Sequence, residues 1–413
     1  MVLGPGLVTG ASDDDPSGIA TYAIAGAALG FGTLWMALVT FPLMAATQFI
    51  SAKIGMVTGT GIAGALRAHF PRWVLFPVVF CLFVANTINA GADIGAIAAA
   101  INLFISVRII YCIVPVSLLL VAVQVFGSYR LIANIFRWLT LALLAYIATA
   151  FFAHPSLHEV ALGTFVPRLS FKVAFISTFV AILGTTISPY LSFWQSSQEV
   201  DEERAHGRTT LSERKGASKA ELKYKAWDVN VGMALSNLVM YFIILTTAAT
   251  LNKAGQTDIS SATQAAEALR PLAGDAAKYL LGLGLIGAGL LAIPVLTGSA
   301  GYAVTEAFGW RSSLDASPSR GKALYGVIAF ATLVGMLMNL VGVNPIKALF
   351  YTAIINALIS APLLALIMLL SNDKTIMGGK TNGLGVNLLG WATTGLMGLG
   401  ALLLIGLWAT GAS

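Results

Sequence analysis

The chain has 413 residues, of which 57% are hydrophobic and only 10% are charged, and its mean hydropathy is +0.83. Soluble globular proteins carry about 25% charged residues, so a water-soluble fold with this composition is excluded. The net charge of +6 does not indicate a nucleic-acid partner, because the lysines and arginines lie between apolar runs. Composition therefore predicts a single all-α integral membrane domain with the lipid bilayer as its solvent.

Apolar runs long enough to cross a bilayer, about 20 residues each, recur along the whole chain. We expect eleven spanning helices, at residues 2–30, 33–57, 73–103, 107–127, 131–153, 171–197, 225–251, 277–308, 321–343, 345–371 and 386–410. A short interfacial helix is expected at 61–69, and a tight turn at 341–345 separates the ninth and tenth spans. The first residues lack the basic region and cleavage site of a signal peptide.

The first span is interrupted by three consecutive carboxylates, Asp13, Asp14 and Asp15, followed by Pro16 and Gly18. A charged group at bilayer depth is costly unless it faces water or a counter-ion. Proline cannot continue the helical hydrogen-bond ladder, and glycine relaxes it further. We therefore expect the helix to open at Asp15 and to expose backbone carbonyls beside a carboxylate. Hard cations prefer these oxygen ligands.

The sixth span carries a second interruption, where Thr185, Ser188 and Tyr190 surround Pro189. Broken segments at corresponding positions of two halves indicate an ion site between inverted repeats. We expect repeat one at 1–153 and repeat two at 171–371, with an extra helix at 386–410. The alternative is a simple proline kink in one span and an aqueous mouth in the other.

Asp15 is the best candidate for the central anionic ligand, because it directly precedes the proline. The hydroxyl of Ser188 and the backbone carbonyls near Ser12, Asp14 and Thr185 are expected to bind the ion or its water.

Other polar residues in the spans have two interpretations each. Asp13 and Asp14 either line a vestibule that concentrates cations or are solvated at a mouth without specific contact. Tyr190 either hydrogen-bonds a water of the ion or packs. Asp93 either contacts the ion or water or is a buried carboxylate bonded to a neighbouring helix. Asn356 either binds the ion's water shell or bonds between helices.

The positions of Lys and Arg predict the orientation in the plasma membrane. A cytoplasmic N-terminus and an extracellular C-terminus leave only a minority of the 24 basic residues outside. The outside set is Arg108, Arg168, Lys172, Lys253, Arg270, Lys278 and Lys347. The linker 199–225 carries both charge signs and is expected to be a solvated cytoplasmic segment, and 252–275 to form an extracellular cap.

At these interruptions the chain resembles the NRAMP family of divalent-metal transporters. The resemblance runs over essentially the whole chain. It is carried by Gly4–Gly6, Asp15-Pro16, Pro189, residues 236–241, Ala300-Gly301-Tyr302 and Glu306. It implies a LeuT-like fold of two inverted five-helix repeats plus an eleventh helix, and a metal site at the two breaks. It also implies a transporter rather than an enzyme, with the metal as substrate and no cofactor, no nucleic acid and no obligate protein partner.

The metal ligands implied by the resemblance are only partly present. Asp15 matches the family's aspartate, but Gly18 stands where the family has asparagine. Ser188 stands where the family has methionine, Thr185 where a backbone carbonyl is donated, and Tyr190 where the family has histidine. A thioether favours transition metals, so its replacement by a hydroxyl leaves an all-oxygen site suited to Mg²⁺ or Ca²⁺. Small residues at Gly18 and Ser188 are expected to leave volume for a largely hydrated ion.

This pattern resembles the family's magnesium-transporting branch. The family's proton route is also incomplete, since its acidic positions fall on Asn89 and Ala92, leaving Asp93 displaced by about 100° around the helix. The sequence therefore predicts uncoupled Mg²⁺ transport by alternating access, with Mn²⁺ also carried. The alternatives are a proton-coupled Mn²⁺ or Fe²⁺ transporter, a sodium-coupled carrier of an organic solute, and a non-transporting receptor or scaffold.

Overall fold

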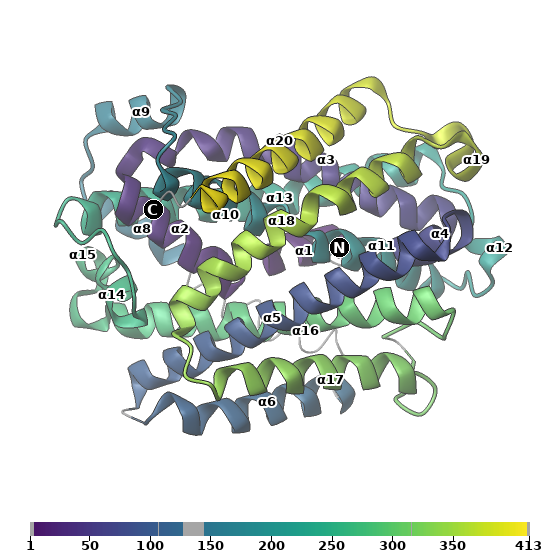
Figure 1. The fold of residues 1–413 in the computed structure, drawn as a ribbon, viewed down its shortest axis with the longest axis horizontal. Coiled ribbons are helices and arrows are strands. Elements are labelled where there is room, and N and C mark those ends of the chain that lie inside the picture. Colours follow the sequence, from purple (N-terminus) through teal and green to yellow (C-terminus); the bar gives the residue numbers. More distant parts are fainter. Residues whose placement is uncertain (1–3, 106, 127–143, 315, 411–413) are drawn as a thin grey trace.

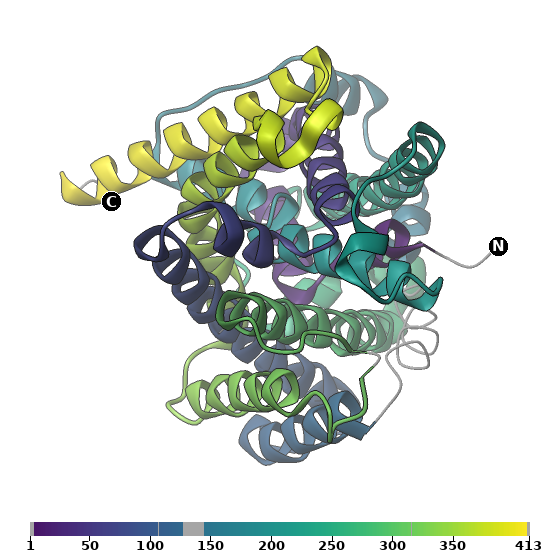
Figure 2. The same cartoon turned by 90° about the vertical axis from the view of Figure 1, so that its right-hand side faces the viewer.

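The computed structural model describes residues 4–105, 107–126, 144–314 and 316–410. Every regular element in these ranges is a helix, and the long helices lie roughly along one common direction (Figures 1 and 2). Nine stretches within them are long and apolar enough to cross a membrane. They correspond to nine of the eleven predicted spans, and the all-α membrane architecture is confirmed.

The spanning helices match the predicted runs closely, because each apolar run is bounded by glycine, proline or charge. Their bounds are α3 Trp35–Thr58, α5 Arg72–Phe104, α6 Ile109–Phe126, α10 Val173–Thr186, α11 Pro189–Ala205, α13 Lys219–Thr247, α16 Ala277–Phe308, α17 Lys322–Asn339, α18 Pro345–Asn372 and α20 Leu384–Ala409. The first predicted span consists of two half-helices, α1 Pro5–Asp13 and α2 Pro16–Leu29. Of the fifth, only α8 Leu144–Phe152 belongs to the described residues.

Short helices connect and cap the spans. They are η1 Gly30–Thr33, α4 Ile62–His69, α9 Leu157–Phe165, α12 Leu211–Arg214, η3 Ala248–Asn252, α14 Ala262–Glu267, α15 Arg270–Ala273, η4 Gly274–Ala276, α19 Lys374–Met377 and η5 Gly378–Lys380. The predicted helix at 61–69 is α4, and the predicted turn at 341–345 separates α17 from α18. The segment 252–275 contains helices α14 and α15, and its place as an extracellular cap stays a prediction.

The two broken spans lie in the interior, where small residues let backbones touch. A Cβ atom on Gly10 of α1 would overlap the backbone of Gly232 in α13. A Cβ atom on Gly184 of α10 would overlap the Ala353 carbonyl in α18. Such close approach replaces the hydrophobic driving force that helices lack in lipid. It holds α1 against α13 and α10 against α18.

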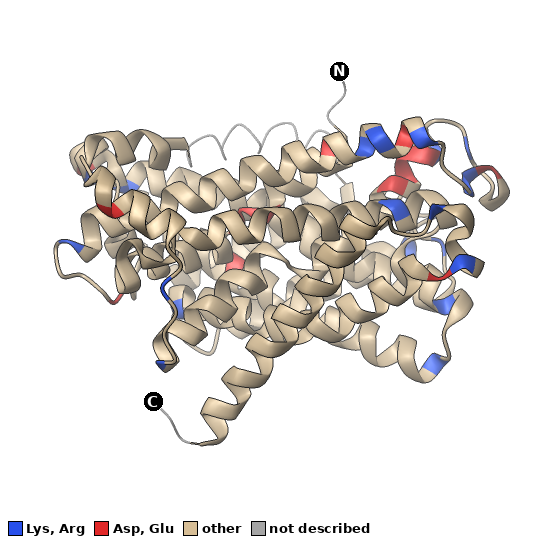
Figure 3. Ribbon diagram, turned by 90° about the horizontal axis from the view of Figure 1, so that it is seen from above, with Lys and Arg blue, Asp and Glu red and all other residues tan. Residues whose placement is uncertain are grey.

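Basic residues gather at one end of the helix bundle. Helices α4, α12 and α19 lie at this end, and α9, α14 and α15 lie at the other (Figure 1). Figure 3 shows the same asymmetry in the distribution of Lys and Arg. The helices expected on the cytoplasmic side therefore share one end. The orientation itself stays a prediction.

The linker 199–225 is not simply solvated, which corrects the sequence interpretation. The continuation of α11 places Glu199 at 1% exposure, and the start of α13 places Lys225 at 3%. The Lys225 ammonium lies 2.9 Å from Glu199 and 2.8 Å from Glu202. Charge density in the sequence did not show that two of these charges neutralise each other inside the protein.

This buried pair belongs to a chain of contacts that joins α1, α11 and α13. Asp228 lies 3.5 Å from the Lys225 ammonium and accepts a 2.8 Å hydrogen bond from the Gly6 backbone N–H of α1. On the other side, Gln195 donates to Glu199 at 2.6 Å, and Thr9 of α1 donates to Gln195 at 2.5 Å. The N-terminal half-helix α1 is thus hydrogen-bonded to α13 at Gly6 and to α11 at Thr9.

We expect Lys225→Met to destabilise the protein strongly. Removing one partner of a buried ion pair leaves an uncompensated charge, Glu199 here, at a cost of about 3–5 kcal/mol. Thermal unfolding of the detergent-solubilised protein measures the change. Lys223→Met, at an exposed position on the same helix, is the matched control. Equal, small shifts for both variants would contradict the assignment.

Candidate cation site

The first helix opens where the sequence predicts. α1 ends at Asp13, Asp14 leaves helical geometry with φ −81° and ψ 53°, and Asp15 is extended with φ −70° and ψ 168°. Pro16 is then the first residue of α2, where its missing N–H removes no helical hydrogen bond. The last carbonyls of α1 and the first N–H groups of α2 are left without partners in their own helices.

The Asp15 carboxylate caps the N-terminus of α2. One oxygen accepts hydrogen bonds from the Ser17 hydroxyl at 2.6 Å and from the Gly18 backbone N–H at 2.7 Å. The other accepts from the Asn89 side-chain amide of α5 at 3.1 Å. The helix dipole favours an anion at this position. A carboxylate has about four lone-pair directions, so three protein contacts leave room for one further donor or cation.

The second break has the same construction. α10 ends at Thr186, Ser188 is extended with φ −73° and ψ 132°, and Pro189 begins α11. The Ser188 hydroxyl lies 2.7 Å from the Gly184 carbonyl and 2.9 Å from the Thr185 carbonyl. Both predicted oxygen ligands, the Ser188 hydroxyl and the Thr185 carbonyl, therefore contact each other here. Each keeps a lone pair for an ion or water.

The two breaks meet in the middle of the protein. The Tyr190 hydroxyl donates to the Ser12 carbonyl at 3.2 Å, and the hydroxyls of Ser17 and Thr185 are 3.5 Å apart. Tyr190 is 1% exposed, so it bridges the two breaks instead of only packing. The structure thus brings Asp15, Ser12, Thr185, Ser188 and Tyr190 to one junction.

The volume expected at Gly18 is already occupied. A Cβ atom there would lie 3.2 Å from the Thr185 hydroxyl and 3.3 Å from the Tyr22 ring. Glycine at this position lets α10 approach α2 and does not, in this conformation, widen the site.

Asp13 and Asp14 are buried, which corrects both sequence interpretations of these residues. They are 0% and 6% exposed. The Ser236 hydroxyl of α13 lies 2.5 Å from one Asp13 oxygen and 3.3 Å from one Asp14 oxygen. Neither carboxylate is at a solvated mouth in this conformation. Asp13 and Asp14 share the Ser236 hydroxyl, whereas Asp15 caps α2 through Ser17 and Gly18.

Two further polar residues lie in the interior with unused atoms. Both oxygens of Asp93 and both polar atoms of Asn356 lack a hydrogen-bond partner among the described residues. Asp93 is one helical turn beyond Asn89 on α5, and it interacts electrostatically with Asp15. The bond between helices that one interpretation gave to Asn356 is therefore absent from the described residues, whereas Asp93 of α5 interacts with the Ser17 backbone N–H of α2. Unused buried oxygens indicate water or an ion, since leaving them unpaired is costly.

Sequence reasoning missed three residues at this junction as site residues: Asn89, Ser17 and Tyr22. Ser17 could have been found from its position two residues after an N-cap aspartate. Tyr22 lies one turn after Gly18 on the same face. The contact from Asn89 spans 74 residues of sequence, so no local pattern could reveal it.

The junction fits a cation held mainly by oxygen and water. In the described ranges no three His, Cys, Asp or Glu side chains converge as a ready metal cluster. Neither break contains methionine, cysteine or histidine. The Asp15 carboxyl group, with hydroxyls, carbonyls and an amide around it, belongs to the oxygen-rich kind of environment that hard cations prefer.

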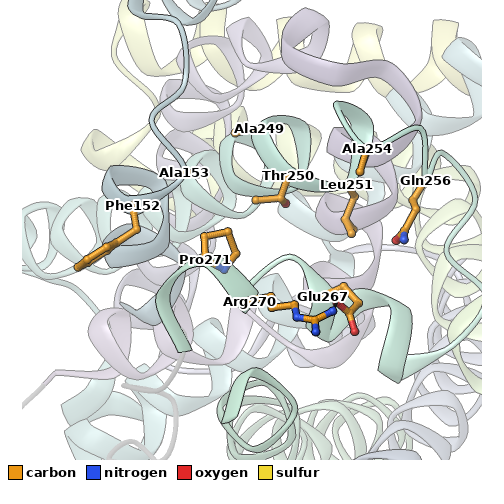
Figure 4. A pocket seen from close by; sticks show the side chains of 10 residues that line it. All are labelled: Phe152, Ala153, Ala249, Thr250, Leu251, Ala254, Gln256, Glu267, Arg270 and Pro271. Carbon is orange, nitrogen blue, oxygen red and sulfur yellow. Dashed lines mark hydrogen bonds and ion pairs between the residues drawn. The ribbon is translucent and has the colours of Figure 1, made fainter. Parts of the chain in front are cut away.

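A separate cavity of about 490 Å³ lies away from the breaks, between α8, η3 and α15 (Figure 4). Its charged lining residues, Arg270 and Glu267, form an ion pair at 3.1 Å. None of the break residues lines it. It belongs to the predicted extracellular cap and not to the ion site.

Comparison with known proteins assigns the chain to a family. Residues 6–407 match the family described as natural resistance-associated macrophage protein-like. The chain belongs to this family, abbreviated NRAMP.

A curated NRAMP relative, the divalent metal cation transporter MntH of Klebsiella pneumoniae, is 29% identical over 406 residues, covering 96% of this chain and 91% of the relative. The manganese transporter of Eremococcus coleocola, solved as a point mutant, superimposes with a TM-score of 0.76 at 18% identity, covering 97% of this chain and 85% of that one.

A more distant structure, the nucleobase-cation-symport-1 transporter Mhp1, has a TM-score of 0.60 at 14% identity and covers 99% of this chain and 93% of that one. These likenesses confirm the LeuT-like fold. The relatives are transporters and not enzymes.

We expect Tyr190→Phe to lower stability by about 1 kcal/mol, because it removes the hydrogen bond between the two breaks. Tyr146→Phe is the matched control: its hydroxyl is also buried but has no partner among the described residues. Thermal unfolding compares the two variants. A Tyr190→Phe protein as stable as Tyr146→Phe would show that the bridge contributes nothing.

Proposed function

We propose that this protein carries a divalent metal cation across the membrane by alternating access, with Mg²⁺, largely hydrated, as its main substrate. The observation that carries the proposal is the Asp15 carboxylate, buried at the meeting point of two broken helices, whose hydrogen-bond donors among the described residues are one hydroxyl and two amide groups. Family membership supports the class of substrate, since the curated relative is a divalent metal cation transporter.

The hydrogen bonding of Asp15 favours recognition through water. Because three protein donors already contact this carboxylate, it can add one contact but not enclose a bare ion. Mg²⁺ dehydrates reluctantly and usually keeps several waters, so a site with few direct ligands suits it. Asp93 and Asn356, whose polar atoms are unused, would face the outer waters.

We propose uncoupled transport because two groups expected in the family's proton route are missing. The predicted ninth span, α17, carries no charged residue after Lys322, and the sixth-span break has tyrosine instead of histidine. Movement of Mg²⁺ into the cell is then driven by its gradient and the membrane potential, worth roughly 4.6 kcal/mol for two charges at 100 mV.

The second candidate is a proton-coupled Mn²⁺ transporter. It is favoured by the relatives, one of which is named as a manganese transporter. It requires a soft ligand at the break, and the described contacts there involve only oxygen and nitrogen atoms. All-oxygen sites discriminate weakly, so we expect Mn²⁺ to be carried as well.

The decisive measurement is metal flux into proteoliposomes containing an internal pH reporter, with Mg²⁺ and Mn²⁺ in parallel. We expect Mg²⁺ entry without acidification. We expect Asp15→Asn to reduce entry by about 100-fold, since a charged contact of up to about 3 kcal/mol is lost while the helix cap is retained. Asp258→Asn, in the exposed 252–275 segment, should transport normally. Entry of Mn²⁺ alone, with proportional acidification, would refute the proposal.

Restoring a thioether tests the selectivity argument. We expect Ser188→Met to raise the preference for Mn²⁺ over Mg²⁺ by about tenfold, the effect of one ligand contact of about 1.4 kcal/mol. Ser188→Leu has similar bulk without sulfur and should lower both fluxes without changing their ratio. Competition between the two metals in the same flux assay measures this ratio. An unchanged ratio in Ser188→Met would place the ion away from Ser188.

A further inference from the structure

A second site lies on the outer surface of the helix bundle, between α5, α16 and α17. These three helices run side by side at one edge of the molecule (Figure 1). They enclose a groove of about 550 Å³ whose lining residues are all apolar. Five of them are phenylalanines: Phe76, Phe80, Phe83, Phe308 and Phe330. Because the three helices span the membrane, this groove faces the hydrocarbon of the bilayer.

The groove has a notch in the middle of one wall. A Cβ atom added to Gly326 of α17 would meet nothing within 4 Å. Phe330 stacks against Phe83 of α5 with ring centroids 6.1 Å apart, which closes the groove one turn further along. A flexible acyl chain can enter the open space at Gly326 beside these aromatic rings.

Two basic residues lie at one end of the groove, which we call its head, where α5 and α17 begin. Arg72 lies one turn before Phe76 on α5, and Lys322 lies one turn before Gly326 on α17, so each shares the face of its wall. Both are exposed, and neither forms an ion pair within the part of the chain that the structure describes. The acidic residue at this end of α16, Glu306, is hydrogen-bonded to Gly64 and Ser197 instead.

Aromatic residues show where the head of the groove meets the membrane surface. Trp73 is 77% exposed, and Trp310 is 50% exposed and stacks on Phe308 at 4.7 Å. Tryptophan is enriched at the boundary between hydrocarbon and headgroups. Arg72 and Lys322 are therefore at headgroup depth, and the phenylalanines are below them.

We propose that this groove binds an anionic phospholipid, with its headgroup between Arg72 and Lys322 and an acyl chain along the phenylalanines. A free cationic group near an anionic membrane surface contributes about 1 kcal/mol, and both residues lack an ion-pair partner among the described residues. A zwitterionic lipid can fill the groove but has no net charge to pair with them. The site is independent of the proposed transport function.

The test measures lipid binding to the purified full-length protein in detergent. Native mass spectrometry and thermal unfolding follow the addition of phosphatidylglycerol or phosphatidylcholine with identical acyl chains. The charge variant is Arg72→Gln with Lys322→Gln, and its control is Lys374→Gln with Lys380→Gln at the same basic end. The groove variant is Gly326→Leu, and its control is Gly395→Leu, an exposed position on α20 with equally open space.

We expect phosphatidylglycerol to bind more tightly than phosphatidylcholine. The charge variant should weaken phosphatidylglycerol binding by about 25-fold, about fivefold for each lost cation, and leave phosphatidylcholine unchanged. Gly326→Leu should weaken both lipids, and both controls should bind as the parent does. Unfolding without lipid establishes that each variant is folded. Equal binding of the two lipids, equal losses in variant and control, or no effect of Gly326→Leu would overturn the proposal.

Discussion

The capping of α2 by Asp15 is the interaction on which the interior depends. Within a membrane, an opened helix must find partners for its free backbone groups inside the protein. Asp15 provides one by accepting from the Gly18 N–H, and Asn89 ties the same carboxylate to α5. Ser17, held by Asp15, then faces Thr185 across the second break. A single side chain thus orders the first break, its attachment to α5 and its approach to α10.

Charged and polar contacts at the basic end fasten α1 to its neighbouring helices. Gly6 and Thr9 of α1 are bound to α13 and α11 through Asp228 and Gln195, and the link between those two helices is the buried Lys225–Glu199 pair. The backbone contact between Gly10 and Gly232 adds to this attachment. The first half-helix is therefore fastened to α13 and α11, whereas the two breaks contact each other at longer distances of 3.2 and 3.5 Å.

Several sequence interpretations failed for one common reason, which is that they assigned environment from composition. Asp13 and Asp14 looked like mouth residues but are buried against Ser236, whose distance along the chain hides the contact. The charges of the 199–225 segment indicated a solvated surface, yet Glu199 and Lys225 form a buried ion pair. The missing side chain at Gly18 was expected to leave volume for an ion, yet Thr185 of the neighbouring helix occupies that volume.

The sequence by itself determined most of the spans, the two breaks and the family. Apolar run length, a proline and an aspartate are local properties, and the backbone must respond to them wherever the segment lies. The tertiary structure alone decided that Asp13 and Asp14 are buried against Ser236 and that Tyr190 reaches Ser12. It also decided that five phenylalanines form one groove. These outcomes depend on contacts between residues far apart in the chain, and a local pattern does not encode which helices meet.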